Sequence, residues 1–333
     1  MKAFGVHEDW TATPPGRTPA QVMTRYPKAS IGRPFVNGAL SPVQDLRPKI
    51  LGAIQTYLNA GVKLIYVSVK TDITTTRAGD WNVRYQEAGV YIAQLMDQYN
   101  CVIILIPYHE PEDNFTDGTD FVHYYNKVFD NVKLGNSSVM VKPCFLGYHW
   151  ALNSGGTASI GGKTNNPSDW FTGLKMTDGV TIDCYNGRSF PLDQILTEHP
   201  GFSRWIQYLP SNIRYALTER GWETPSSTNG TNRSALRATT MRREFDWFLS
   251  ADPIAARCDD YIVWSSPGTE DADGLIMDAA AEAEIDRFLS LVSFEGTGGT
   301  GPTIKVWNGT SEVSVTIKVW NGTAEVSVTP SVF

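Results

Sequence analysis

Short apolar runs, rich in β-branched residues, alternate with longer segments of helical pattern along most of the chain. The apolar runs predict eight buried strands, at residues 3–6, 29–36, 63–69, 102–108, 139–146, 180–185, 213–218 and 261–265. The segments between them predict helices, among them residues 43–60, 82–99, 120–132, 167–175, 192–196, 234–249 and 279–292. Strands that are buried on both faces and separated by helices favour a parallel sheet with right-handed crossovers.

The number and order of these elements predict an α/β fold, a (β/α)8 TIM barrel over residues 1–293. A doubly wound open sheet is the competing fold, but no GxGxxG or P-loop follows the first strand. Long segments rich in Gly, Asn, Ser, Thr and aromatic residues follow several strands, at residues 71–81, 110–119, 148–166 and 219–232. The reverse connections are short, so we expect function at the carboxyl ends of the strands.

The composition changes abruptly at Phe294. Residues 294–302 form a Gly/Thr-rich linker, and residues 303–333 contain a near-perfect tandem repeat of Thr-Ile-Lys-Val-Trp-Asn-Gly-Thr. Asn308-Gly309 and Asn321-Gly322, each flanked by alternating residues, predict two β-hairpins. Because two short hairpins bury little surface alone, we expect a β-repeat for attachment or oligomerisation. A tail that becomes ordered only against another molecule is the alternative.

Composition and charge exclude several classes of function. The net charge of −7 argues against nucleic acid or an anionic membrane as the main partner. No window approaches 18 continuous apolar residues, which argues against membrane insertion, and the first residues lack the features of a signal peptide. The four cysteines show no CxxC spacing and lie far apart, which predicts buried free thiols rather than disulfides or a zinc site.

Two glutamates follow buried strands that are far apart in the sequence. Glu110 ends the run at residues 102–108, and Glu219 ends the run at residues 213–218. Two carboxyl groups at one barrel mouth are what hydrolysis of a glycosidic bond needs, with one as acid/base and the other as nucleophile. This chemistry requires no metal or organic cofactor.

Other chemistries fit the sequence less well. A metal site at His109, Glu110, Glu112 and Asp113 is disfavoured because the chain has no HExxH motif and no second His cluster. A serine nucleophile is disfavoured because the chain has no G-x-S-x-G elbow. Since Pro111 turns the chain, we expect Glu112 and Asp113 to face solvent.

The two strand endings resemble those of clan A glycoside hydrolases, which carry an acid/base Glu after strand four and a nucleophile Glu after strand seven. His109-Glu110 is similar to the His-Glu of the family 26 mannanase-like branch, where many relatives have Asn-Glu. The stretch at residues 182–186, Ile-Asp-Cys-Tyr-Asn, resembles the sixth strand of that branch, and Trp264 matches a Trp beneath the sugar ring.

The resemblance at strand seven includes one departure from the family pattern. Thr218-Glu219, followed by Gly221 and Trp222, resembles a Thr-Glu-Phe-Gly strand, with Arg220 in place of the aromatic residue. A guanidinium beside Glu219 would hold that carboxylate ionised, or Arg220 forms a structural ion pair. Both interpretations stay open.

The resemblance implies a role for each matching residue. Glu110 is the expected general acid/base and Glu219 the nucleophile. His109 is expected to hydrogen-bond the substrate or orient Glu219, Tyr185 to reach toward Glu219 or the sugar, and Trp264 to stack under the ring. Strand capping by His109 and core packing by the two aromatic residues are the structural alternatives. Further expected sugar contacts near the mouth are His7, Glu8, Trp10, Arg33, His149, Trp150 and Trp222.

The C-terminal Lys-Val-Trp-Asn-Gly repeat is similar to repeats of minor tail proteins in phages of actinobacteria. This resemblance implies a virion protein, bound through its repeat to other phage tail proteins or to copies of itself, that binds or cleaves polysaccharide at the host cell surface. The main alternative is a non-catalytic receptor-binding or structural tail protein on a glycosidase-like barrel. A lysin acting on peptidoglycan is a third.

Overall fold

A computed structural model describes residues 2–8, 15–36, 40–146, 158–160, 163–165, 167–186, 209–222, 233–265, 278–292, 303–307, 312–316 and 331–332. The chain divides into two compact units, Met1–Val292 and Ser293–Phe333. Among the described residues, no helix is long and apolar enough to cross a membrane.

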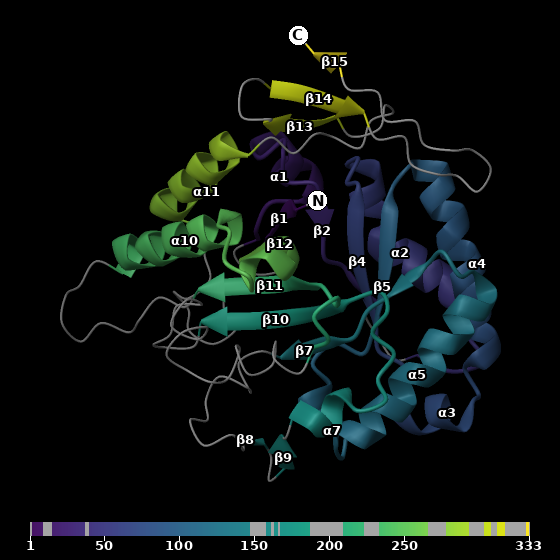
Figure 1. Ribbon diagram of the computed structural model, residues 1–333. Helices are drawn as coiled ribbons and strands as arrows, with labels where there is room; N and C mark the ends of the chain where they lie inside the picture. Colours follow the sequence, from purple (N-terminus) through teal and green to yellow (C-terminus); the bar gives the residue numbers. More distant parts are fainter. Residues whose placement is uncertain are drawn as a thin grey trace. The chain divides into compact units, whose positions relative to one another are not determined.

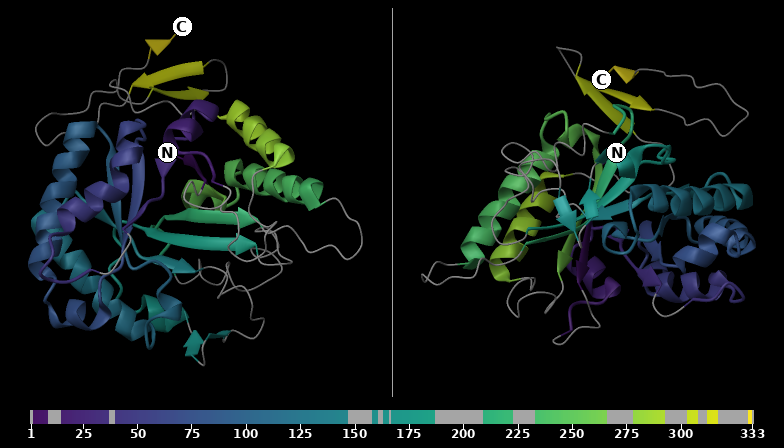
Figure 2. Two further views of the ribbon diagram at one scale, coloured as in Figure 1. Left: turned by 180° about the vertical axis from the view of Figure 1, so that it is seen from behind. Right: turned by 90° about the horizontal axis from the view of Figure 1, so that it is seen from below.

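The first unit is built around a curled sheet of parallel strands with helices on its outer side (Figures 1 and 2). The strands are β1 (Ala3–Glu8), β2 (Ile31–Gly32), β3 (Phe35–Val36), β4 (Leu64–Val69), β5 (Val102–Pro107), β6 (Met140–Val141), β7 (Cys144–Leu146), β10 (Val180–Asn186), β11 (Tyr215–Trp222) and β12 (Cys258–Ser265). Neighbours pair in the order β6-β5-β4-β2-β1-β12-β11-β10-β7, and β3 also pairs with β4.

The two ends of this strand order belong to one stretch of chain. β6 pairs with β5 and β7 pairs with β10, and only Lys142 and Pro143 separate β6 from β7. The sheet therefore closes on itself through two halves of a single predicted strand. The predicted α/β architecture, a parallel-strand barrel with surrounding helices, is confirmed.

Prolines interrupt two of the predicted strands. Pro143 lies between β6 and β7, and Pro34 lies between β2 and β3. Proline has no N–H to donate to a strand ladder, so the ladder breaks there. The run at residues 29–36 is thus two short strands, with Arg33 and Pro34 in the break.

The helices that surround the strands are α1 (Pro19–Arg25), α2 (Leu46–Asn59), α3 (Ile73–Ala78), α4 (Asn82–Tyr99), α5 (Gly118–Gly135), α7 (Pro167–Phe171), α10 (Arg233–Leu249) and α11 (Ala279–Leu291). Four of them begin after an aspartate whose side chain accepts a backbone N–H bond of the first turn: Asp45, Asp72, Asp117 and Asp278. The predicted helix at 167–175 ends already at Phe171, and the one predicted at 192–196 lies outside the described residues.

The barrel interior is filled by apolar side chains below the carboxyl ends of the strands. Its core cluster consists of Ile31, Tyr66, Ile104, Ile106, Cys144, Ala216 and Ile262. All four cysteines are buried and free, as the sequence predicts. This packed interior gives the strand tips a rigid base.

The second unit contains β13 (Thr303–Trp307), β14 (Glu312–Thr316) and β15 (Ser331–Val332). β14 pairs antiparallel with β13 and with β15. The predicted turns Asn308-Gly309 and Asn321-Gly322 lie outside the described residues. Attachment through this unit stays a prediction.

Candidate active site

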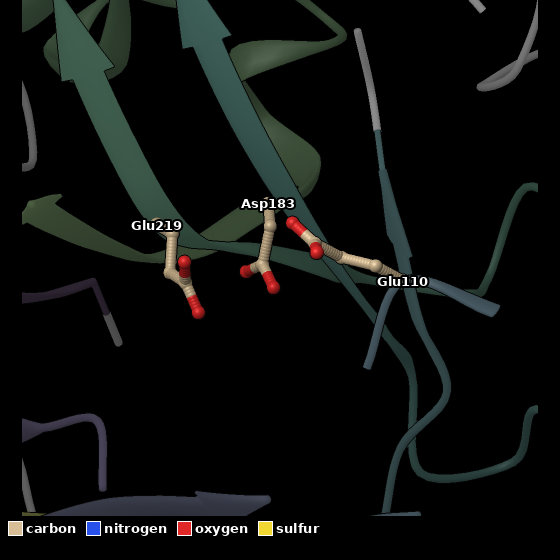
Figure 3. Close-up of side chains that lie close together, drawn as sticks. All are labelled: Glu110, Asp183 and Glu219. Atoms are coloured by element: carbon tan, nitrogen blue, oxygen red, sulfur yellow. The ribbon is translucent and has the colours of Figure 1, made fainter. Parts of the chain in front are cut away.

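Three carboxylates meet in the carboxyl-terminal half of the barrel (Figure 3). Glu110 follows β5, Asp183 belongs to β10 and Glu219 belongs to β11. One carboxylate oxygen from each lies within 4.8 Å of those from the other two. The structure thus brings together the predicted pair, Glu110 and Glu219, and adds Asp183, to which the sequence analysis assigned no role.

A shift in strand register aligns Asp183 with Glu219. Ile182 is opposite Leu217, but the next residue, Asp183, is opposite Glu219, so Thr218 is passed over. Such an irregularity redirects side chains and is common next to active sites. The Thr218 hydroxyl instead donates a 2.6 Å hydrogen bond to Asp183 Oδ1.

Arg33 supplies the positive charge of this cluster from the break between β2 and β3. Its Nη2 atom lies 3.1 Å from Asp183 Oδ2 and 3.1 Å from Glu219 Oε1. Burial alone lowers the pKa of the guanidinium, but the charges of Asp183 and Glu219 outweigh it and raise that pKa. Arg33 is fully buried. Its predicted contact with sugar therefore stays a prediction, while its ion pairs are a finding.

Three hydrogen-bond donors hold Asp183 in place, one from β7, one from β11 and one from the break between β2 and β3. Besides Thr218 and Arg33, the Cys144 thiol donates to Oδ2 over 3.0 Å. Burial, followed by the charge of Asp183, raises the pKa of Cys144 well above its usual value, so the thiol keeps its proton and acts as a donor. These bonds fix a fully buried carboxylate, since a buried charge needs partners.

The backbone that carries Glu110 is strained. Tyr108 and Glu110 have φ angles of 61° and 54°, in the left-handed region that non-glycine residues rarely adopt. Each such residue costs about 1–3 kcal/mol and persists only where its surroundings impose it. Here the Tyr108 N–H donates to Val69 O over 3.0 Å and the Glu110 N–H donates to Cys144 O over 3.1 Å. Bonds to both neighbouring strands therefore fix the position of Glu110.

The environment of Glu110 favours its protonated form. Burial and the nearby charge of Asp183 raise the pKa of Glu110 to about 7, against the opposing effects of Lys70 and Arg33. A carboxyl group with a pKa near neutrality can donate its proton and later take one back. This is the property that the acid/base role requires.

An aromatic cluster is formed by residues on β1, β3 and β12 and by His109, which follows β5. The indole of Trp264 stacks on His7, with ring centres 3.9 Å apart and planes 4° apart. Phe35 contacts Trp264 and His109 edge to face, at 5.7 Å and 4.9 Å. Burial, followed by Arg33 and Lys70, lowers the pKa of His109 well below its usual value, so its imidazole is neutral. His7, His109 and Trp264 thus belong to one aromatic cluster that is joined through Phe35, and their contact with sugar stays a prediction.

Arg220 forms the structural ion pair that the sequence left open. It is fully buried, and its Nε donates to Glu244 Oε2 on α10 over 2.9 Å. Its Nη1 donates to the carbonyl of Cys184 over 3.1 Å. The guanidinium beside Glu219 is therefore that of Arg33, which the sequence did not indicate.

The expectation that Glu112 faces solvent is wrong. Pro111–Asp113 form a 3-10 turn, which directs Glu112 inward. Glu112 is fully buried, and its Oε1 accepts a 3.0 Å hydrogen bond from the Leu146 N–H. Asp113 is exposed, as predicted. Glu112 therefore ties the turn after β5 to β7.

Of the remaining predicted sugar contacts, only Glu8 has a described side chain. Glu8 accepts hydrogen bonds from the backbone N–H and the side chain of Arg17, at 2.8 and 2.9 Å. Trp10, His149 and Trp150 lie outside the described residues, as do the side chains of Tyr185 and Trp222, whose backbones belong to β10 and β11.

Within the described part of the chain, these three carboxylates are also close enough together to hold a metal ion. Arg33 already lies at ion-pair distance from two of them, so the cluster holds a built-in cation. The donor set therefore fits acid/base chemistry better than metal binding.

The fold is similar to those of solved glycoside hydrolases. The catalytic domain of Bacillus sp. JAMB-750 GH26 endo-β-1,4-mannanase aligns with a TM-score of 0.55 and 14% identity, over 87% of this chain and 85% of that one. A Faecalibacterium prausnitzii β-glucuronidase aligns with a TM-score of 0.50 and 12% identity, over 87% of this chain and 49% of that one, so the chain spans about half its length. No protein-family model and no curated protein sequence matches the chain. The likeness confirms a glycosidase-like barrel.

Proposed function

We propose that the chain is a retaining glycoside hydrolase in which Glu110 is the general acid/base and Glu219 the nucleophile. The observation that carries the proposal is the approach of their carboxylate oxygens to within 4.8 Å at the carboxyl ends of the strands. Carboxyl groups lie about 5–5.5 Å apart in retaining enzymes and about 6.5–9.5 Å apart in inverting ones. The 4.8 Å limit refers to the nearest oxygens, and so close an approach allows Glu219 to attack directly, as in a retaining enzyme. The raised pKa of Glu110 supports its role as the acid.

In this mechanism the two glutamates act in turn. Protonated Glu110 gives its proton to the glycosidic oxygen while Glu219 attacks the anomeric carbon, so that the glycosidic bond breaks and a glycosyl ester forms. Glu110, now a carboxylate, then takes a proton from water, which attacks the anomeric carbon and releases Glu219. Arg33 lies 3.1 Å from Glu219 Oε1 and favours the charged nucleophile before attack.

The aromatic rings of Trp264, His7 and Phe35 support a sugar as the ligand. Trp264 is partly exposed while His7, stacked behind it, is buried, so one face of the indole is supported by protein. Flat aromatic faces provide apolar contact with little loss of conformational entropy. We infer that Trp264 forms the platform on which the substrate lies. His109, which is neutral and half-buried, hydrogen-bonds the substrate or orients Glu219.

The substrate that we propose is a polysaccharide, which the enzyme cleaves at internal glycosidic bonds. The likeness to a GH26 endo-β-1,4-mannanase makes β-1,4-mannan the first glycan to test. The test compares wild type with Glu110→Gln and Glu219→Gln on mannan and a panel of host-wall polysaccharides. The matched control is Glu87→Gln, at a partly exposed position of α4. We expect both site variants to lose about 10²-fold or more of the turnover on one common glycan, and the control to keep it.

Two outcomes would contradict the proposal that the chain is a glycoside hydrolase. Equal turnover by wild type and both site variants would remove the glutamates from the chemistry. Glycan binding by the wild type without any product would favour the non-catalytic receptor-binding alternative. Retention itself is read from the anomeric configuration of the first product by NMR.

We further propose that the repeat at residues 303–333 attaches the barrel to a phage tail, where it meets polysaccharide at the host surface. The resemblance of the repeat to those of minor tail proteins and the antiparallel pairing of β13 with β14 support this role. The test is the presence of the chain in purified phage particles, with and without residues 303–333. Equal incorporation of both forms would contradict it.

A further inference from the structure

Lys70 is a cation at the mouth of the barrel that the proposed mechanism does not use. It is the first residue after β4, and its ammonium lies 5.2 Å from the centre of the Tyr108 ring. Among the residues that the structure describes, this ammonium forms no hydrogen bond and no ion pair. The carboxylates that act on it are, in order of effect, Glu110, Asp183 and Glu219. Lys70 therefore lies at the end of β4, next to the end of β5 that leads to Glu110, and its ammonium contacts only the Tyr108 ring among the described residues.

The backbone on both sides of Lys70 is fixed. Val69 pairs with Pro107, and its carbonyl accepts the Tyr108 N–H over 3.0 Å. On the other side, the buried Thr71 hydroxyl lies 2.7 to 2.8 Å from the hydroxyls of Thr76, Tyr85 and Tyr124. A surface lysine needs no such anchoring. A pre-positioned cation loses less conformational entropy when an anion binds.

The charges of the site leave the Lys70 ammonium available. In the form that is ready to react, Glu110 is neutral, and the carboxylates of Asp183 and Glu219 are both paired with Arg33. Burial lowers the pKa of Lys70, because a partly desolvated ammonium has lost some of its hydration. An anion on the substrate would replace that hydration.

We propose that Lys70 binds a carboxylate on the substrate and that the site accepts a glycan built from carboxyl-bearing sugars. A monoanion is favoured over a doubly charged phosphate, because a single ammonium faces the anion while Asp183 and Glu219 repel any second negative charge. This inference rests on the proposed function, since it assigns a substrate class to the same site.

The test uses pairs of oligosaccharides that differ only in the carboxylate. β-1,4-Mannotetraose and its β-1,4-mannuronate counterpart form one pair, and tetrasaccharides of α-1,4-linked galactose and of α-1,4-linked galacturonate form another. Binding is measured by calorimetry in the Glu110→Gln background, which mimics the protonated acid and prevents turnover. Lys70→Met is compared with Lys70→Arg and with Lys63→Met, a matched change just before the opposite end of β4.

We expect the acidic member of one pair to bind more tightly than its neutral partner. Lys70→Met should weaken that binding about 10- to 100-fold, since a hydrogen bond to a charged group contributes roughly 1.5–3 kcal/mol. Lys70→Arg should retain most of it, and Lys63→Met all of it. Tighter or equal binding of the neutral member, no binding of either member in any pair, or an equal loss for both members in Lys70→Met would overturn the inference.

The two proposals fail in different ways. Turnover of a neutral glycan that depends on Glu219 but not on Lys70 would keep the hydrolase and reject the acidic substrate. Lys70-dependent binding of an acidic glycan, without turnover by the wild type, would keep the recognition and reject the hydrolase.

Discussion

Asp183 lies within 4.8 Å of Glu110, so a buried carboxylate is the immediate neighbour of the proposed acid. Burial is the largest cause of the upward shift in the pKa of Glu110, and the charge of Asp183 is the next cause. Arg33, Cys144 and Thr218 hold Asp183 in this position. Asp183 therefore acts on the proposed acid through its charge, which helps to raise the pKa of Glu110.

Replacing Asp183 by Asn should shift the pH profile of the reaction. Activity should fall as pH rises through about 7, where Glu110 loses its proton. Removing the negative neighbour lowers the pKa of Glu110, so the alkaline limb of kcat/KM should move down by roughly one pH unit. Asp113→Asn serves as a control, because the exposed Asp113 raises the same pKa less than Asp183 does. An unmoved limb in Asp183→Asn would contradict the assignment.

The raised pKa of Glu110 also predicts a dependence of stability on pH. The pKa is about 7 in the folded protein and 4.5 in its ordinary state, so the folded form holds the proton more tightly. The stabilisation is fully present below about pH 4.5, and it is lost as pH rises through about 7. The shift corresponds to on the order of 3 kcal/mol.

Denaturation of wild type and Glu110→Gln between pH 4 and 8 measures this effect. Gln keeps the size of the side chain and stays neutral, so the variant should gain stability over wild type as pH rises. Parallel stability curves across that range would show that Glu110 ionises normally in the folded protein.

Most of the fold could be predicted from the sequence because buried strands and amphipathic helices leave periodic signals. The breaks in two strands were also readable, since Pro34 and Pro143 lie inside the apolar runs. Glu110 and Glu219 stand out for the same reason, as charged residues where an apolar run ends. Local sequence order was sufficient for these features.

The interior partners of the site depend on contacts between distant segments. The sequence predicts Arg33 as a sugar contact, and its ion pairs become visible only when β10 and β11 bring Asp183 and Glu219 to it. Arg220 looks like a neighbour of Glu219 until α10 supplies Glu244. One signal for Asp183 was present, because a charged residue inside the apolar run at 180–185 needs a buried partner.

Replacing Arg33 by Met should destabilise the barrel and abolish turnover. The change leaves Asp183 and Glu219 buried beside each other without their shared cation, which costs about 3–5 kcal/mol when a buried pair loses one partner. Urea denaturation measures the loss. The double variant Arg33→Met/Asp183→Asn removes one of the two buried carboxylates that have lost Arg33, so it should recover part of the stability. Equal stability of the single and double variants would show that Arg33 does not neutralise Asp183.

Arg220→Met should destabilise the protein without impairing the chemistry of the molecules that remain folded. The Arg220 guanidinium pairs with Glu244, which also accepts a 2.7 Å hydrogen bond from the Tyr261 hydroxyl, and all three side chains are fully buried. Leaving Glu244 with a buried, unneutralised charge should lower the free energy of unfolding by about 3–5 kcal/mol.

The companion variant Arg220→Met/Glu244→Met removes both charges and should be more stable than Arg220→Met alone, because well-packed apolar residues often replace a buried ion pair at little cost. Active-site titration with a mechanism-based inhibitor gives the folded, competent fraction for each variant. Per competent site, kcat should stay within about twofold of wild type, since the charge beside Glu219 comes from Arg33, 3.1 Å away, and not from Arg220. A large fall in kcat per site in the double variant would instead place Arg220 in control of the nucleophile.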